Sequence, residues 1–273
     1  MIRNVLSIAG SDPSGGAGIQ ADLKAFSARG VYGMAALTAL TAQNTQGVTG
    51  VHPVPPHFVA DQINAIFADV HVDAVKIGMI ANAAIASAVA DILARHRDVP
   101  VVLDPVMIAK GGAALLAADA VDVLTTRLLP LATVVTPNLP EAAALLHDVE
   151  AKSREDMARQ ALALAMLGPS AVLVKGGHLE GDESPDVLAS GDHVTWFEAE
   201  RLPTKNTHGT GCTLSSAIAA EIAKGLSLPE AVAVGKTYLA AAVAAADQLS
   251  VGSGHGPVQH FHALWPNRQG AEK

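Results

Sequence analysis

Short runs of aliphatic residues alternate along this chain with longer, alanine-rich segments of helical period. The aliphatic runs are apolar at successive positions, as in strands that are buried on both faces, and they lie at residues 5–9, 74–77, 99–103, 133–135 and 171–174. The segments between them repeat apolar residues at helical spacing and lie at residues 17–28, 56–70, 83–96, 120–129 and 153–167. This alternation predicts an α/β domain of three layers, in which helices cover both faces of a mostly parallel sheet.

The pattern changes toward the C-terminal end. Residues 186–190 and 193–199 are separated by Gly191-Asp192 and predict an antiparallel hairpin added to the sheet. Two further helices are predicted at 211–224 and 229–248. The sequence contains no long polar linker, repeat or low-complexity tract, so we expect one domain over residues 1–273.

Composition narrows the class of protein. Half of the 273 residues are apolar and 16% are charged, which favours a compact globule. The net charge of −8 and the lack of a basic block argue against binding to nucleic acid. A single cysteine excludes an intramolecular disulfide and fits a reducing compartment. The N-terminus does not resemble a signal peptide, and the apolar stretch 238–246 is too short to span a bilayer, so we expect a cytoplasmic protein without a membrane partner.

The segment 206–212, Asn-Thr-His-Gly-Thr-Gly-Cys, is the most informative motif because it leads directly into a predicted helix. Amides in the first turn of a helix have no partner within the helix, and glycine allows an anion to approach them closely. The motif therefore predicts a phosphate or oxyanion site, with Cys212 at a helix start, where a thiol ionises more easily. A simple turn with Thr210 as the N-cap is the alternative.

Other polar and glycine-rich clusters follow the predicted strands, at residues 10–12, 78–79, 104–105, 136–138 and 175–178. Open α/β sheets bind ligands at the carboxyl ends of their strands. We therefore expect these clusters to form one site.

Asn138 and Glu141 stand three residues apart at a predicted helix start, so both side chains share one face. Such a pair suits Mg²⁺ held through water molecules. An N-terminal capping box explains the same spacing and, for the pair alone, is the more common explanation.

The glycine-rich loop 10–18 lacks both the Rossmann and the Walker spacing. It favours a close backbone approach to a small substrate, with Asp22 one helical turn deeper as a hydrogen-bond acceptor; a long turn between strand and helix is the alternative. Gln43, placed between two β-like stretches, offers a donor and an acceptor in one plane, which suits the edge of an aminopyrimidine. A solvated loop glutamine is the simpler explanation.

Lys175 follows a buried run and precedes two glycines, so its ammonium group can reach a phosphate or extend into solvent at the sheet edge. A zinc site at His260 and His262 is disfavoured because the sequence supplies no third ligand at a suitable spacing. A covalent nucleophile at Cys212 with His208 as its base is also disfavoured, because no acyl-transfer signature accompanies the two residues.

Taken in order, these motifs resemble the hydroxymethylpyrimidine/phosphomethylpyrimidine kinases of thiamine biosynthesis. The resemblance covers nearly the whole chain and is carried by residues 8–24, 38–45, 75–79, 103–107, 136–142, 174–178, 205–215 and 256–265. It implies a ribokinase-like fold and ATP-dependent phosphorylation of 4-amino-5-hydroxymethyl-2-methylpyrimidine, then of its monophosphate. It also implies Mg²⁺ as the metal ion and a homodimer.

The resemblance assigns roles to individual residues. The anion hole and catalytic positions would be Gly209, Thr210, Gly211 and Cys212. Substrate would be bound by Gln43, Asp22, Gly10, Met79 and Thr41. The nucleotide would be bound by Lys175, Lys236, Asn138 and Thr207, and the metal by Asn138, Glu141 and Asp104. Lys110, Lys236 and Asp104 match the family pattern more loosely than the others.

One position departs from the wider ribokinase-like fold, most members of which have an aspartate as general base where this chain has Cys212. A helix start would lower the pKa of a thiol, so Cys212 is either a base or a group that positions the alcohol. Two other functions remain open: a pyridoxine or pyridoxal kinase of the same fold, and a catalytically silent pyrimidine sensor.

Overall fold

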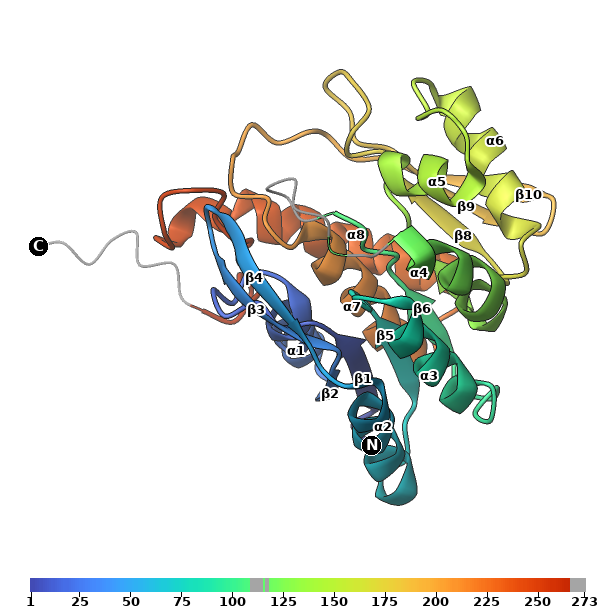
Figure 1. Cartoon of the computed structure of the whole chain (residues 1–273). Coiled ribbons are helices and arrows are strands. Elements are labelled where there is room, and N and C mark those ends of the chain that lie inside the picture. The colour runs from blue at the N-terminus through green and yellow to red at the C-terminus, as the bar shows by residue number, and fades with distance from the viewer. Residues whose placement is uncertain (109–114, 116–117, 266–273) are drawn as a thin grey trace, which may run out of the picture.

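The protein is a three-layer structure around an eight-stranded sheet, in a computed structural model that describes residues 1–108, 115 and 118–265 (Figure 1). The strand order in this part of the chain is β10-β9-β8-β7-β6-β5-β1-β2. The strands are β1 (Asn4–Ala9), β2 (Tyr32–Leu37), β5 (Ala74–Ile77), β6 (Val101–Leu103), β7 (Val134–Val135), β8 (Val172–Lys175), β9 (Asp186–Ser190) and β10 (His193–Phe197). Neighbouring strands from β2 to β8 pair in parallel, whereas β9 pairs antiparallel with both β8 and β10. The predicted parallel sheet and its antiparallel hairpin are confirmed.

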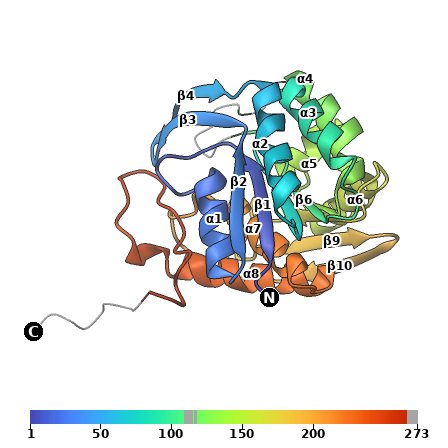
Figure 2. The ribbon, with the colours of Figure 1, turned by 90° about the horizontal axis from the view of Figure 1, so that it is seen from below.

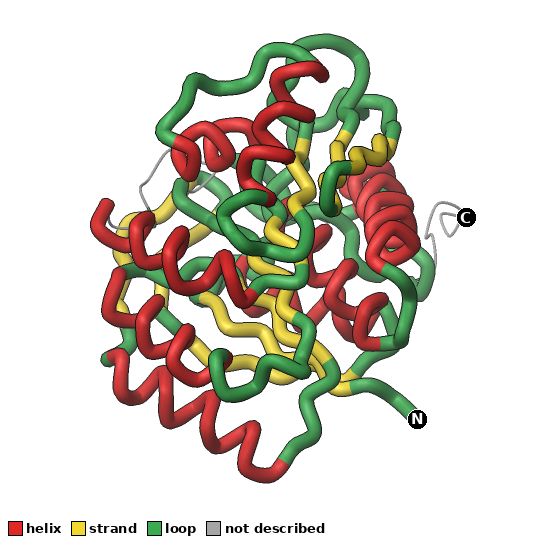
Figure 3. Tube along the Cα trace, turned by 90° about the vertical axis from the view of Figure 1, so that its right-hand side faces the viewer, coloured by secondary structure: helices red, strands yellow, loops and turns green. Residues whose placement is uncertain are grey.

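Helices cover both faces of this sheet (Figures 2 and 3). One layer contains α1 (Gly18–Ala28), α7 (Thr210–Ala223) and α8 (Leu228–Ala244), which pack on one another. The other layer contains α2 (Pro56–Asp69), α3 (Ala83–Leu93), α4 (Ala118–Val123), α5 (Leu139–Leu146) and α6 (Arg154–Ala165). Alternate residues of β1 serve the two layers, because Leu6 and Ile8 join one apolar cluster and Val5 joins the other. This explains why the strand is apolar at successive positions.

β2 was not predicted, and its sequence explains why. It reads Tyr-Gly-Met-Ala-Ala-Leu, without the β-branched residues that favour strands. A Cβ at Gly33 would lie 2.9 Å from Leu23 and 3.0 Å from Phe26, so glycine lets α1 pack closely on the strand. Tertiary packing, rather than local propensity, makes this segment a strand.

A second, two-stranded sheet projects beside β2 and consists of β3 (Ala39–Asn44) and β4 (Gly47–Pro53), paired antiparallel (Figure 1). The prediction that Gln43 lies between two β stretches is wrong, because Gln43 is part of β3. The register shifts between Ala42 and Gln43, and such an irregularity interrupts the side-chain alternation that identifies a strand in a sequence.

The other predicted helices differ mainly at their ends. The segment predicted as a helix at 120–129 is α4 followed by a π-helical turn (Leu124–Leu128) and a 3₁₀ turn (Leu129–Leu131) that contains Pro130. α8 ends at Ala244, and a 3₁₀ turn (Ala246–Gln248) follows. Among the described residues, no helix has the length and apolar character needed to cross a membrane.

Candidate functional site

A cavity of about 500 Å³ opens at the carboxyl ends of the parallel strands. It lies beside β1, whose neighbours β5 and β2 extend the sheet in opposite directions. Ligands bind at this kind of position in open α/β sheets. The predicted site residues that line the cavity are Gly10, Thr41, Gln43, Met79, Asp104, Asn138, Glu141, Lys175, Thr207, Gly209, Thr210, Gly211 and Cys212. The structure therefore gathers them into one site.

The N-terminus of α7 faces this cavity. Its N-cap is Gly209, in the left-handed conformation with φ of 78°, and Thr210 is the first helical residue rather than the cap. A glycine cap has no side chain to cover the first amides, so these can meet an anion. A Cβ at Gly209 would also clash with the carbonyl oxygen of Gly16, so both backbone geometry and packing require glycine here.

Three ionisable groups form what we call the phosphoryl end of the cavity. Lys175, at the end of β8, lies 2.8 Å from Asp104 Oδ1 and 4.0 Å from Glu141 Oε2. Asp104 follows β6 and also accepts hydrogen bonds from Thr136 and Ser215. Burial raises the pKa of Asp104, but Lys175 and Lys76 more than offset this and hold it below its usual range.

Lys175 also stands beside the start of α7. A Cβ at Gly211 would lie 3.3 Å from Lys175 Nζ, so glycine keeps the helix start and the lysine close together. The ammonium group and the uncapped helix start thus offer positive charge to the same space. An anion such as a phosphate suits this arrangement.

Asn138 and Glu141 form a capping box at the start of α5. Asn138 N donates to Glu141 Oε2 over 2.8 Å, and Glu141 N donates to Asn138 Oδ1 over 2.9 Å. Both residues also line the cavity. The two sequence interpretations are therefore compatible, since the cap holds the carboxylate at the cavity wall.

The donor set fits Mg²⁺ better than a metal held by protein side chains alone. No group of three His, Cys, Asp or Glu side chains suitable for a metal ion occurs among the described residues. Mg²⁺ instead binds through one or two carboxylates, water molecules and substrate phosphates. Burial, which outweighs the lowering by Lys175, and the neighbouring Asp104 together raise the pKa of Glu141 to about 7. Two buried carboxylates at one wall fit a cation that arrives with a phosphate ligand.

The thiol of Cys212 differs from the expectation that a helix start makes it easy to ionise. Burial raises its pKa to about 11, and this outweighs the lowering by Lys76 and by a hydrogen bond from the Gly18 backbone. The carboxylates of Asp22 and Asp104 raise the pKa as well. The expectation of a lowered pKa is wrong because desolvation is the largest influence. At neutral pH the thiol is protonated.

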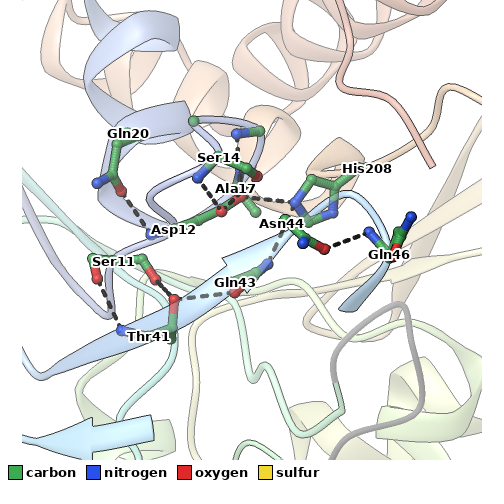
Figure 4. A network of polar contacts seen from close by, with 12 residues as sticks. Ser11, Asp12, Ser14, Ala17, Gln20, Thr41, Gln43, Asn44, Gln46 and His208 are labelled. Atoms are coloured by element: carbon green, nitrogen blue, oxygen red, sulfur yellow. Dashed lines mark hydrogen bonds and ion pairs between the residues drawn. The ribbon is translucent and has the colours of Figure 1, made fainter. Parts of the chain in front are cut away.

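What we call the ring end of the cavity is formed by the glycine loop 10–18, β3 and His208. Asp12 organises the loop, because its carboxylate accepts hydrogen bonds from Ser14 N, Ser14 Oγ, Gly16 N, Ala17 N and His208 Nε2 (Figure 4). Burial raises the pKa of Asp12, but the hydrogen bonds from His208 and Ser14 bring it down to about 2. The loop is thus a defined structure around a carboxylate and not only a long turn.

Gln43 and Thr41 extend from β3 beside this loop (Figure 4). Thr41 Oγ1 donates to the Ser11 carbonyl oxygen over 2.9 Å and lies 3.3 Å from Gln43 Oε1. Met79 packs against Gly10, where a Cβ would clash with the methyl group of Met79. These residues give the ring end an amide, a hydroxyl and a thioether surface.

Two residues assigned by sequence lie outside the cavity lining. Asp22 is fully buried and accepts hydrogen bonds from Lys76, Ser7 and Ser216. Lys236 is buried as well and lies 2.6 Å from Asp186. Both form ion pairs inside the protein, and residue type and sequence spacing could not have predicted these pairs. Lys110 lies outside the described residues.

Sequence analysis gave no binding or catalytic role to Asp12, His208 or Lys76, although all three line the cavity. Asp12 and His208 stood within the motifs that carried the resemblance, so their positions gave a usable signal. Lys76 lies inside a buried strand with no exposed surface and contacts Asp22 over 2.8 Å. Lys76 also lies within a motif of the resemblance, at residues 75–79, but its place in an aliphatic run is equally typical of a lysine paired in the core.

Known proteins share both the sequence and the fold. The phosphomethylpyrimidine kinase family model matches residues 12–259. The hydroxymethylpyrimidine/phosphomethylpyrimidine kinase of Rhizobium meliloti is 56% identical over 265 residues, which cover 97% of this chain and 99% of that protein.

Solved structures agree. A pyridoxal kinase of Bacillus subtilis, crystallised as an ADP complex, superposes with a TM-score of 0.88 at 36% identity and covers 96% of this chain and 99% of its own. A phosphomethylpyrimidine kinase of Clostridium difficile superposes with a TM-score of 0.77 at 43% identity and covers 87% and 97%. These likenesses confirm the ribokinase-like fold. The chain belongs to the phosphomethylpyrimidine kinase family.

Proposed function

We propose that this protein transfers the γ-phosphoryl group of ATP to 4-amino-5-hydroxymethyl-2-methylpyrimidine and then to its monophosphate. One observation carries the proposal: a single cavity joins a cationic, uncapped helix start to an amide-bearing ring end. The family membership supports the substrate and the place in thiamine biosynthesis. ATP is supported by a structural relative that was crystallised with ADP.

In the first transfer, the hydroxymethyl oxygen attacks the γ-phosphorus of ATP. A new P–O bond forms, the bond to ADP breaks, and the hydroxyl proton leaves to solvent. The transition state is loose, so positioning and charge stabilisation supply most of the rate. The amides at the start of α7 and the ammonium of Lys175 are placed to stabilise the charge on the phosphoryl oxygens. In the second transfer, a phosphate oxygen of the monophosphate is the nucleophile.

In this proposal Cys212 positions the nucleophile and does not act as the base that removes its proton. With a pKa of about 11, its thiol is protonated at neutral pH and can make a hydrogen bond to the attacking oxygen. Little base strength is needed in a loose transfer, so a neutral group is adequate at this position.

Mg²⁺ is proposed to bind with the nucleotide at Asp104, Glu141 and Asn138. The ion would neutralise charge on the nucleotide phosphates. Glu141→Gln should raise the Mg²⁺ concentration required for half-maximal rate about tenfold, because one carboxylate ligand is lost while the cap acceptor remains. A titration of the rate against Mg²⁺ checks this, with Glu230→Gln in the capping box of α8 as the control. An unchanged Mg²⁺ requirement would reduce Glu141 to its capping role.

Pyridoxal is the second candidate substrate, because pyridoxal kinases superpose on this chain with TM-scores of up to 0.89. A coupled ADP-release assay should compare hydroxymethylpyrimidine, its monophosphate and pyridoxal. We expect the two pyrimidines to have the higher kcat/KM. A higher kcat/KM for pyridoxal would overturn the assignment of the pyrimidines as substrates. A lack of turnover with all three compounds would favour the catalytically silent pyrimidine sensor.

The remaining expectations are also proposals. We expect the protein to act in the cytoplasm, as a homodimer and without nucleic acid. The acidic net charge supports the last of these. Sedimentation equilibrium at several concentrations tests the homodimer.

A further inference from the structure

Lys76 and Asp22 form an ion pair in which neither side chain has any exposed surface. Lys76 Nζ donates to Asp22 Oδ1 over 2.8 Å and to Oδ2 over 3.0 Å. The carboxylate also accepts hydrogen bonds from Ser7 Oγ over 2.6 Å and from Ser216 Oγ over 2.7 Å. The four residues come from β5, α1, β1 and α7, so four elements of the fold hold the pair in one orientation.

The positive end of this pair faces the cavity. Lys76 belongs to the cavity lining, whereas Asp22 does not. A Cβ at Gly78 would lie 2.8 Å from Lys76 Nζ, so glycine leaves room for the ammonium group just after β5. Because Lys76 has no exposed surface, its ammonium group acts on the cavity through its charge and not through contact with a ligand.

Cys212 lies on the side of α7 that covers the ion pair. It precedes Ser216 by one helical turn, so the two side chains share a face of the helix, and Ser216 donates to Asp22. Burial is the largest influence on the pKa of the thiol and raises it, but the lowering by Lys76 exceeds the raising by Asp22. This order is expected if the ammonium group is the nearer of the two charges. The charged groups that face the thiol are Lys76, Lys175, Asp22 and Asp104.

We propose that Lys76 is a positioning residue for phosphoryl transfer, whose ammonium group is held behind Cys212 by Asp22 and stabilises negative charge on the attacking oxygen. The inference rests on the proposed function, which places that oxygen beside the thiol. In the first transfer the attacking hydroxyl binds neutral, and negative charge develops on it only during the reaction. In the second transfer the attacking phosphate oxygen is charged before the reaction. Lys76 should therefore act after binding in the first transfer and already on binding in the second.

Removing the charge in two ways separates this role from packing. Lys76→Met leaves the buried carboxylate of Asp22 unpaired, so stability and kcat should both fall. Lys76→Met combined with Asp22→Asn removes both charges and keeps a side chain that can bond to the two serines. We expect the urea midpoint of this double variant to recover most of the wild-type value, while kcat with hydroxymethylpyrimidine stays about tenfold lower. If it does not fold by circular dichroism, Lys76→Gln with Asp22→Asn keeps a hydrogen bond between the two positions and takes its place.

The two substrates supply a second measurement. With the alcohol, the double variant should lose kcat at a nearly unchanged KM, because the charge on the nucleophile develops only in the transition state. With the monophosphate, its KM should rise about tenfold, because the nucleophile is already anionic when it binds. General damage to the site would not distinguish a neutral from a charged nucleophile.

Alkylation of Cys212 by iodoacetamide tests the placement of the charge without a substrate. Cys212 is the only cysteine of the chain, so the reaction reports on this thiol alone. The thiolate is the reactive form, and loss of the nearer positive charge disfavours it. The double variant should therefore be alkylated about threefold more slowly than the wild type at pH 9.

The matched control is another ion pair of α7. Arg29 lies 2.6 Å from Glu221, and neither residue lines the cavity. Arg29→Met combined with Glu221→Gln should leave kcat, KM and the alkylation rate unchanged.

Each other outcome overturns the proposal. A folded double variant with wild-type kcat and KM would make the Lys76–Asp22 pair purely structural, and so would the same loss with both substrates. An unchanged alkylation rate would mean that the charge does not act at Cys212. If the wild type turns over neither pyrimidine, the proposed function itself fails, which is a different result.

Discussion

The two ends of the cavity are built differently. The phosphoryl end uses side chains that follow β6 and β8, and its lysine and aspartate meet over 2.8 Å. The ring end uses the glycine loop and a hairpin outside the main sheet, and the contacts of its recognition amide are 3.3 and 3.4 Å long. The groups proposed for phosphoryl transfer thus follow strands of the main sheet, whereas the amide proposed for ring recognition lies on a hairpin outside it. The pyridoxal kinase of Bacillus subtilis shares this fold with a TM-score of 0.88. A common sheet combined with a variable hairpin is consistent with kinases of one fold that act on different rings.

The strongest way to break this division is Gly209→Ala, because Gly209 touches both ends. Its φ of 78° and the clash with Gly16 should cost about 2 kcal/mol or more of stability. Misplaced amides at α7 should lower kcat by about 10²–10³. Thermal unfolding and steady-state kinetics measure the two effects.

Gly225→Ala is the matched control, since Gly225 has φ of 95° and no atom within 4 Å of an added Cβ. It should show the backbone penalty alone, with nearly normal turnover. Equal effects of the two substitutions on stability and kcat would mean that the contact between Gly209 and Gly16 does not contribute to activity. Gly211, unlike Gly209, is an ordinary helical residue.

A second test loosens the phosphoryl end through pH. His260 Nε2 contacts Thr213 Oγ1 in the first turn of α7 over 3.0 Å, and burial lowers the pKa of His260 to about 4. The unfolded chain binds this proton below pH 6.5, and the folded protein binds it only near pH 4, so unfolding takes up a proton between these values. Stability should therefore fall by up to about 3 kcal/mol as the pH drops through this window.

Urea unfolding at pH 7, 5.5 and 4.5 measures this loss, and His260→Gln should flatten it. The low pKa of Asp12 acts in a separate window, because its contribution is present above pH 3.8 and disappears as the pH falls toward 2. A wild-type curve that is flat between pH 7 and 4.5 would contradict the assignment to His260.

Gln43→Leu addresses the ring end alone. Losing the amide should weaken pyrimidine binding by about 1–3 kcal/mol and leave ATP affinity unchanged. Gln46→Leu, in the turn of the same hairpin, is the control, because Gln46 bonds to Ser253 at the surface. Weaker binding of both ligands would show that the two ends are not separable.

The smallest effect is expected for Cys212→Ser. A neutral thiol and a hydroxyl can make the same hydrogen bond, so turnover should fall by about tenfold or less. Cys212→Asp should be worse, since it places a negative charge near the incoming phosphate. A loss of about 10²–10⁴ in the serine variant, with activity kept in the aspartate variant, would establish a general base instead. Both substrates should be assayed.

The sequence predicted the phosphoryl end better than the ring end, and the reason is physical. Asp104 and Lys175 follow buried strands, and strand ends meet at one edge of a parallel sheet. Gln43 lies in an irregular hairpin whose alternation is interrupted, so its position could not be derived from periodicity. β2 was missed because close packing, not propensity, makes it a strand.

Charge pairs set a different limit. Asp22 and Lys236 resemble ligand-binding residues in type and position, yet each forms an ion pair with a buried residue, Lys76 and Asp186 respectively. Lys76, which faces the cavity, resembles a core lysine in the same respect. Whether an ionisable side chain is available to a ligand or forms an ion pair inside the protein depends on which charged groups the fold places within contact distance. Only the folded arrangement contains that information.

The contact between Gly16 and Gly209 has a consequence for how such a site can change over time. Each position excludes a side chain because of the other loop: a Cβ at Gly209 would strike Gly16, and a Cβ at Gly16 would strike the His208 ring. A side chain at Gly209 cannot be accommodated by trimming Gly16, since glycine is already the smallest residue, and a side chain at Gly16 requires a second change at His208 in the other loop. Substitutions at the contact between the two loops must therefore occur together. A change of ring specificity is more easily reached by substitutions in the β3–β4 hairpin.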